Sequence, residues 1–173
     1  FAMIQNLLPA EGRSLRIGLL YNQSEPQSVS SYERLNKLAV DKGVELIAKA
    51  VNTSADVSLV TAALLNEELD AFFANPDNTI FSAFETILKA CTNAGVPVFT
   101  SEAGLVARGA VAAFGADIYE WGYQSGVQAV QFLRQGNAER LSPELVKVRK
   151  RLYNPASAAN FNLVLPENFS PVQ

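Results

Sequence analysis

Short apolar segments alternate with helical patterns along the first hundred residues of the chain. The apolar segments have the length and composition of buried strands, and a helical pattern separates each one from the next. Successive strands begin about 26 to 28 residues apart, which is typical of β-α-β units. We therefore predict an α/β fold with a doubly wound parallel sheet in the strand order 2-1-3-4. The four predicted strands span residues 16–21, 44–51, 70–74 and 96–100.

Apolar residues at helical spacing predict the helices that precede and connect these strands. The third helix is expected to begin near Thr53, because its hydroxyl can cap the amide three positions on. Cys91 lies on the apolar stripe of the fourth helix, so we expect a buried, unreactive thiol. The predicted helices lie within residues 1–12, at 30–42, from 53 onward and at 80–94.

The pattern changes after residue 104. Residues 105–109 are predicted to form a loop, and residues 110–114 a fifth strand. Asp117 is the expected N-cap of a long helix that ends near Gln135.

The last thirty residues are predicted to return to the sheet. Residues 145–153 alternate between apolar and basic side chains, which is typical of a half-buried edge strand protected by positive charge. The alternative is that these basic side chains form an anion site. Asn154 and Pro155 are expected to open a short helix that ends near Asn162, and the remaining tail is expected to be extended.

Polar clusters follow three of the predicted strands, at the point where each strand ends. Open parallel sheets bind ligands outside the carboxyl ends of their strands, in the crevice where the strand order reverses. In the order 2-1-3-4 this crevice lies between the first and third strands. We therefore expect residues 22–31 and 75–79 to line a ligand site, with Ser101 and Glu102 beside them.

The residues of these clusters suit both ends of a zwitterionic small molecule. The helix starts at Ser28 and Ser30, and at Asn78 and Thr79, offer amide N–H groups to a carboxylate or phosphate. The carboxylates of Asp77 and Glu102 suit an ammonium group or sugar hydroxyls. The alternative is that these residues only cap helices and form turns.

Composition narrows the class of protein. The 173 residues are 49% hydrophobic and 18% charged, which indicates one globular domain. The net charge is −3 and no basic run precedes residue 147, so no nucleic-acid partner is expected. No stretch approaches the ~20 apolar residues that span a bilayer, and no signal peptide is visible.

The sequence also lacks the residues of common catalytic sites. It contains no histidine, which excludes Ser-His-Asp and Cys-His catalysis and histidine-containing zinc sites. No glycine-rich phosphate-binding motif follows any strand. We expect a non-catalytic protein without cofactor or metal; a carboxylate-based activity of Asp77 and Glu102 is the enzymatic alternative.

Several segments of the chain carry a family signature. Residues 17–28 read IGLLYNQSEPQS, and further segments read PDNT at 76–79, PVFTSEAG at 97–104, RGA at 108–110, YNPASAA at 153–159 and PE at 166–167. Together these segments resemble the ABC transporter substrate-binding proteins of the tryptophan/tyrosine type. The resemblance covers essentially the whole chain, in order.

The resemblance implies a lobe of a type I periplasmic binding protein, with a Rossmann-like three-layer αβα fold. Proteins of this family have two lobes, and this chain is similar to the second lobe only, so the first lobe is missing. Residues 1–117 would form the α/β ligand-binding lobe. Residues 118–144 would form a crossover helix that packs on the missing first lobe, and residues 145–173 the returning edge strand and C-terminal tail.

The resemblance also implies a function. A protein of this family captures a small solute, often an aromatic amino acid, and delivers it to the membrane permease of an ABC uptake transporter. It would be extracytoplasmic, either periplasmic or a membrane-anchored lipoprotein. The alternatives are a ligand-sensing domain of a signalling protein and a sugar-binding protein. By position, the family's cleft-lining segments correspond to Asn22, Ser24, Ser28, Asp77, Asn78, Ser101 and Glu102.

The predicted crossover helix carries an apolar face that a missing lobe would leave exposed. We expect the chain alone to cover this face by forming a homodimer or by exchanging the helix with a second copy. The alternative is that the helix folds back onto its own lobe. The face is formed by Ile118, Trp121, Phe132 and Leu133.

Overall fold

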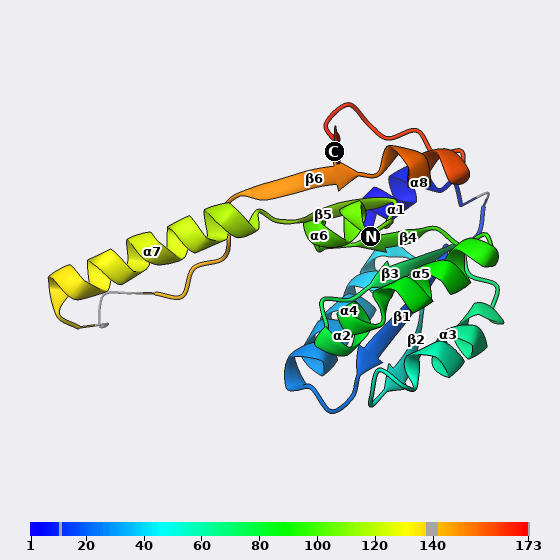
Figure 1. Cartoon of the computed structure of the whole chain (residues 1–173), viewed down its shortest axis with the longest axis horizontal. Helices are drawn as coiled ribbons and strands as arrows, with labels where there is room; N and C mark the ends of the chain where they lie inside the picture. The colour runs from blue at the N-terminus through cyan, green and yellow to red at the C-terminus, as the bar shows by residue number, and fades with distance from the viewer. Residues whose placement is uncertain (11, 138–141, 173) are drawn as a thin grey trace.

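A seven-stranded sheet forms the centre of the structure, a computed structural model that describes residues 1–10, 12–137 and 142–172 (Figure 1). The strand order is β2-β1-β3-β4-β5-β6-β7. The first five strands are parallel, β6 runs antiparallel to β5, and β7 is parallel to β6. The strands are β1 (Arg16–Asn22), β2 (Glu45–Val51), β3 (Ala71–Ala74), β4 (Val98–Thr100), β5 (Ala112–Ala116), β6 (Arg149–Tyr153) and β7 (Ser170–Pro171).

Helices cover both faces of this sheet, so the predicted α/β fold and the strand order 2-1-3-4 are confirmed. Strand β1 lies between β2 and β3 and pairs with both, so the strand order reverses at β1 and creates the switch point that the sequence predicted. The helices are α1 (Ala2–Leu7), α2 (Pro26–Lys42), α3 (Val57–Leu65), α4 (Asn78–Ser82), α5 (Phe84–Asn93), α6 (Ala103–Ala107), α7 (Ile118–Gln135) and α8 (Pro155–Asn160).

Two hydrophobic clusters pack on the two faces because strand side chains alternate in direction. Phe72 belongs to the cluster beneath α3 and α5, whereas its neighbour Phe73 belongs to the cluster beneath α1 and α2. Phe72 is fully buried and Phe73 is only 9% exposed. Since β3 is buried on both faces, its polar end at residue 75 is held in a fixed position.

Two local predictions were wrong. Residues 105–109 were predicted to form a loop, but residues 105–107 lie in α6. The helix forms because the carboxylate of Glu102 caps it and because Leu105 is buried. Thr53 does not begin the third helix. The carboxylate of Asp56 accepts hydrogen bonds from the amide and hydroxyl of Thr53 at 2.9 and 3.0 Å, which closes a turn before α3.

Two further boundaries differ from the prediction. Helix α2 begins at Pro26 rather than near residue 30, because proline has a backbone angle that suits the first helical turn. Strand β6 begins at Arg149, and it is not an edge strand because β7 pairs with its outer side. The guanidinium of Arg151 on β6 lies 4.1 Å from the ring centroid of Phe114.

Helix α7 projects away from the sheet (Figure 1). The carboxylate of Asp117 caps its first turn, as predicted, and also forms a 2.7 Å ion pair with Lys150. No residue of α7 is buried; Trp121 is 51% exposed and Leu133 is 76% exposed. The alternative in which this helix folds back onto its own lobe is therefore wrong. No helix in the described part of the chain is long and apolar enough to cross a membrane.

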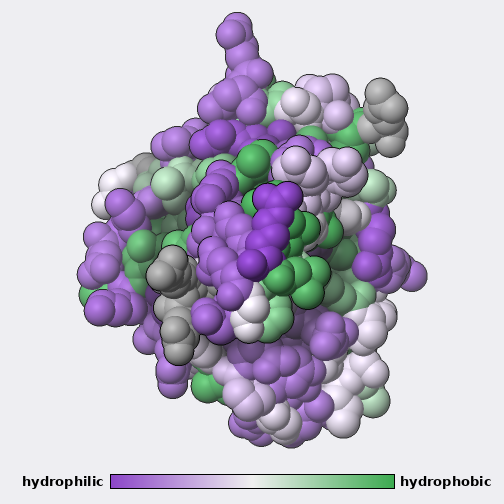
Figure 2. Space-filling view, turned by 90° about the vertical axis from the view of Figure 1, so that its left-hand side faces the viewer, coloured by the Kyte–Doolittle hydropathy of each residue, from purple (hydrophilic) through white to green (hydrophobic). Residues whose placement is uncertain are grey.

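The surface at this end of the molecule is mixed in character. In Figure 2 the side of the molecule toward which α7 projects faces the viewer. On this side, hydrophobic surface lies directly beside strongly hydrophilic surface. The exposed apolar side chains of α7 contribute to it. Such a face suits a protein contact better than free exposure to water.

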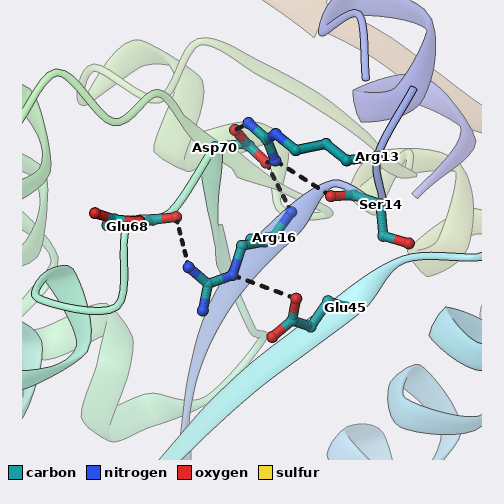
Figure 3. A network of polar contacts seen from close by, with 6 residues as sticks. All are labelled: Arg13, Ser14, Arg16, Glu45, Glu68 and Asp70. Atoms are coloured by element: carbon teal, nitrogen blue, oxygen red, sulfur yellow. Dashed lines mark hydrogen bonds and ion pairs between the residues drawn. The ribbon is translucent and has the colours of Figure 1, made fainter. Parts of the chain in front are cut away.

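An ion-pair network ties the amino ends of the first three strands together (Figure 3). Arg13 holds Asp70 through two hydrogen bonds of 2.6 and 2.7 Å, and the backbone amide of Arg16 donates to the same carboxylate at 2.8 Å. The Arg16 side chain reaches Glu45 on β2 at 3.3 Å. The hydrogen bonds from Arg13 lower the pKa of the Asp70 carboxyl below its usual value. This network lies at the opposite end of the sheet from the predicted ligand site.

We predict that Asp70→Asn removes a pH-dependent part of the stability. Because the pKa of Asp70 is lower in the folded chain, its stabilising effect is present above the unfolded pKa and is lost as pH falls through the folded pKa. The difference in unfolding free energy between wild type and Asp70→Asn should be constant near neutral pH and shrink below about pH 4. Urea denaturation from pH 7 to pH 3 measures this difference.

The matched control for this experiment is Glu68→Gln. Glu68 contributes its backbone carbonyl oxygen to the network, as acceptor for Arg16 at 3.3 Å, and glutamine keeps that carbonyl. This variant should follow the pH dependence of the wild type. If the difference in unfolding free energy between wild type and Asp70→Asn stays the same at every pH, Asp70 does not stabilise the fold in this pH-dependent way.

Candidate functional site

The carboxylate of Asp77 lies at the switch point, between the carboxyl ends of β1 and β3. One oxygen, Oδ1, accepts hydrogen bonds from the backbone amides of Thr79 and Ile80 at 2.8 and 3.1 Å and so caps α4. The other, Oδ2, accepts from the Asn22 amide at 2.9 Å and from the Ser28 hydroxyl in a short hydrogen bond. A single buried carboxylate thus joins the end of β1, the first turn of α2 and the start of α4.

The side chain of Asn22 extends this network toward the surface. Its amide nitrogen donates to the Thr79 hydroxyl at 2.8 Å and, at 3.3 Å, to Glu25 Oε1. Its carbonyl oxygen accepts from the backbone amide of Ser24 at 2.8 Å. Asn22 therefore fixes the loop that follows β1, and it is itself only 5% exposed.

Asn75 forms a second link between β3 and α2. It is fully buried; its side-chain oxygen accepts from the Ser31 hydroxyl at 2.7 Å, and its nitrogen donates to Ser28 at 3.4 Å. The sequence placed Asn75 in a candidate cluster but did not single it out. Asn75 is important because it is a polar side chain buried at the end of a strand. The sequence indicates this only by placing a polar residue directly after an apolar strand.

The structure brings four of the predicted site residues into direct contact: Asn22, Ser28, Asp77 and Thr79. Ser24 and Asn78 are exposed at the rim of this group, and Ser30 is half-buried on α2. The α2 hydroxyls that contact Asn75, the residue after β3, are those of Ser28 and Ser31.

Ser101 and Glu102 lie at the end of β4. The Glu102 amide donates to the Thr100 hydroxyl at 3.0 Å, and its Oε1 caps α6 by accepting from the Gly104 amide at 3.1 Å. Ser101 lines a cavity of about 250 Å³ together with Phe73 and other residues on the α1 side of the sheet. These two residues therefore belong to a part of the strand edge other than the Asp77 network.

A close backbone contact fixes the position of Ser101. The α-carbon of Gly115 on β5 lies so near the Ser101 carbonyl that a β-carbon at this position would come within 1.6 Å of its oxygen. Any side chain larger than hydrogen would push β5 away from the end of β4. Only glycine permits this arrangement.

Most backbone donors of the loop after β1 are used within the chain. The Gln23 amide donates to Val51 at 3.2 Å and the Glu25 amide to Asn22 at 3.2 Å, in addition to the bonds of Asn22 and Ser24. The loop is therefore held in one conformation before any ligand arrives. A ligand would meet mainly side-chain groups at the rim rather than free backbone amides.

The described residues offer no metal centre and no reactive thiol. No group of three or more histidine, cysteine, aspartate or glutamate side chains with metal-binding geometry occurs among them. Burial raises the pKa of the Cys91 thiol to about 12, so it stays protonated and inert, as the sequence predicted.

Comparison with known proteins relates nearly the whole chain to one family. A family model described as an ABC transporter substrate binding protein matches residues 2–172. A protein of Clostridioides difficile strain R20291 named tyrosine-binding protein is 29% identical over 131 residues, which are 76% of this chain and 37% of that protein.

Solved structures share the fold. A conserved domain protein from Vibrio cholerae superposes with a TM-score of 0.86 at 30% identity, covering 99% of this chain and 58% of that one. The ligand-free, open structure of a Clostridium difficile substrate-binding protein with adhesive properties has a TM-score of 0.79 at 25% identity, covering 99% of this chain and 58% of that one.

A third structure, an ABC domain from Streptococcus pneumoniae in complex with L-Trp, has a TM-score of 0.83 at 22% identity. It covers 98% of this chain and 58% of the other, and at this identity it supports the fold alone. The chain thus spans little more than half of these solved chains and little more than a third of the tyrosine-binding relative.

We predict that Asp77→Asn destabilises the chain strongly. An amide has one oxygen, so its NH2 group would face either the two α4 amides or the Asn22 and Ser28 donors. Losing charge-assisted hydrogen bonds and leaving buried donors unpaired should lower the unfolding free energy by about 2 to 4 kcal/mol. Urea denaturation at pH 7 measures the loss.

Glu102→Gln serves as the control for this prediction, because Glu102 caps α6 through a single exposed hydrogen bond that a glutamine oxygen can also accept. Its cost should stay below about 1 kcal/mol. Equal destabilisation by the two variants would show that the buried network has no special weight.

Proposed function

The chain belongs to the family of ABC transporter substrate-binding proteins, and we propose that it forms one ligand-binding lobe of the solute-binding component of an ABC uptake transporter. The family is the one that the sequence motifs indicated. It is a family of binding proteins, in agreement with the expectation that the protein is not an enzyme. In this role the complete protein captures a small solute and delivers it to a membrane permease.

The observation that carries this proposal is the family match over residues 2–172, combined with the preorganised polar group at the switch point. Parallel α/β sheets bind ligands at this place. The buried Asp77 network holds the loop after β1 and the start of α4 in register. The exposed or half-buried side chains at the rim of this network are then available to a ligand: Ser24, Ser30, Asn78 and Thr79. Ser101 and Glu102, which are half-buried at the end of β4, would contribute from the neighbouring part of the strand edge.

An amino acid, in particular an aromatic one, is the ligand class we propose. It is supported by the relative named for tyrosine binding, which aligns with 76% of this chain. Hydroxyl and amide groups at the rim can donate hydrogen bonds to a carboxylate, and a carboxylate beside them suits an ammonium group. A sugar is the alternative ligand, since the same groups also bind hydroxyls.

A second lobe in the complete protein is part of the proposal. It is supported by the coverage of 58% of each solved relative. Residues 1–117 would form the ligand-binding lobe, residues 118–144 the crossover, and residues 145–173 the return; positions 138–141 lie outside the described residues. The exposed apolar side chains of α7 would pack on the first lobe. In the chain alone, a homodimer through the same face stays a prediction.

We also propose an extracytoplasmic location, periplasmic or lipid-anchored, because uptake systems of this kind capture their solute outside the cytoplasm. A ligand-sensing domain of a signalling protein is the alternative context for the same fold. Gene context distinguishes them: a neighbouring permease gene supports transport, whereas a downstream kinase segment on the same chain supports sensing.

The ligand class is tested by thermal shift on the complete protein, with a panel of amino acids, sugars and nucleosides. We predict that L-tyrosine or L-tryptophan raises the melting temperature most, because a ligand that binds only the folded state stabilises it by mass action. Tyramine, which lacks the carboxylate, is the matched control and should give a smaller shift. Stabilisation by sugars or nucleosides only would make the amino-acid assignment wrong.

A further inference from the structure

Glu25 carries an unsatisfied oxygen beside the Asp77 network. Its Oε2 is buried, and it is the buried side-chain nitrogen or oxygen that lacks a hydrogen-bond partner among the described residues. Buried polar atoms are almost always paired, since an unpaired acceptor loses its water without compensation. The Glu25 side chain as a whole is half-buried, so it stands at the border between the network and solvent.

Helix capping does not explain the position of the Glu25 side chain. Glu25 is the N-cap residue of α2, yet its side chain makes no capping hydrogen bond. The N-cap residues Asp77, Glu102 and Asp117 all use their carboxylates to cap their helices. The helix start therefore does not need this side chain, which turns back toward β1 instead.

The contacts that Glu25 does make are long. Its Oε1 accepts from the Asn22 side-chain amide at 3.3 Å and from the Thr79 hydroxyl at 3.4 Å. The same Asn22 side-chain amide donates to the Thr79 hydroxyl at 2.8 Å, which is shorter than its contact with Glu25. The carboxylate can thus move with little loss of hydrogen bonding, and a donor placed beside Oε2 would supply the partner it lacks.

The other two carboxylates near the site differ in this respect. Asp77 accepts four hydrogen bonds from the chain, two on each oxygen, which is about the full capacity of a carboxylate. Glu102 uses one oxygen to cap α6. Of the three, Glu25 alone combines negative charge, a position at the switch point and an acceptor that the fold leaves buried without a partner.

We propose that Glu25 is the residue that receives the ammonium group of the ligand, while Asp77 only positions the loop. The inference rests on the proposed function, an amino-acid ligand bound at this edge of the sheet. An ammonium group has three donors and one positive charge, so it matches an anionic acceptor that is short of donors. Glu25 would then distinguish amino acids from carboxylic acids of the same shape.

The test compares two probes on the complete protein by calorimetry: L-tyrosine and 3-(4-hydroxyphenyl)propionate, which is tyrosine without its amino group. Glu25→Gln should weaken L-tyrosine binding by about 10- to 100-fold, the loss expected for a charge-assisted contact. It should change binding of the des-amino probe by less than about threefold. Glu33→Gln, an exposed glutamate further along α2, should leave both affinities unchanged.

Unfolding of the same variants separates a binding role from a structural one. Glu25→Gln should not lower the unfolding free energy, because it removes a buried charge with an unpaired oxygen, whereas Asp77→Asn should lower it. The proposal is overturned if Glu25→Gln destabilises the fold as Asp77→Asn does. It is also overturned if both probes lose affinity equally, or if Glu102→Gln causes the selective loss. If the unsubstituted protein binds no amino acid, the proposed function falls as well.

Discussion

The hydrogen bonds accepted by the Asp77 carboxylate are the constraint on which the candidate site depends. They connect the start of α4 with the last residue of β1 and the first turn of α2, which lie about fifty residues earlier in the sequence. Because Ser28 and Asp77 are almost completely buried, water does not compete for these bonds. The loop after β1 therefore has its conformation before a ligand binds, which lowers the entropy that binding must overcome.

The two ends of the sheet differ in character: an ion-pair network lies at the amino ends of the strands, and the candidate ligand site lies at their carboxyl ends. At the amino ends of the strands, the ion pair between Arg13 and Asp70 stabilises the fold. At the carboxyl ends, buried polar residues replace the apolar core and leave groups such as Thr79 half-buried at the rim. Helix α7 projects away from the sheet (Figure 1), and none of its residues is buried against the described part of the chain. The arrangement suits a lobe that meets a second surface.

The sequence predicted the sheet well and the site in part. Strand positions and order followed from apolar runs such as residues 70–74, because a strand buried on both faces has a distinctive composition. Helix α6 was predicted as a loop, because a helix of five residues is too short to show helical spacing of its apolar side chains. Glu25 lies within residues 22–31, which were predicted to line the ligand site, but the sequence did not single it out. An unpaired buried oxygen is a property of three-dimensional packing, and no pattern along the chain reports it.

We propose that this chain supplies one half of a ligand site that the complete protein closes from two sides. In a two-lobed binding protein, closure depends on contacts with both lobes, so one lobe alone binds weakly. Calorimetry with the same amino acid on the 173-residue chain and on the complete protein measures this directly. The chain alone should bind the amino acid at least ~100-fold more weakly, which is a loss of ~3 kcal/mol. Equal affinity of the two proteins would contradict it.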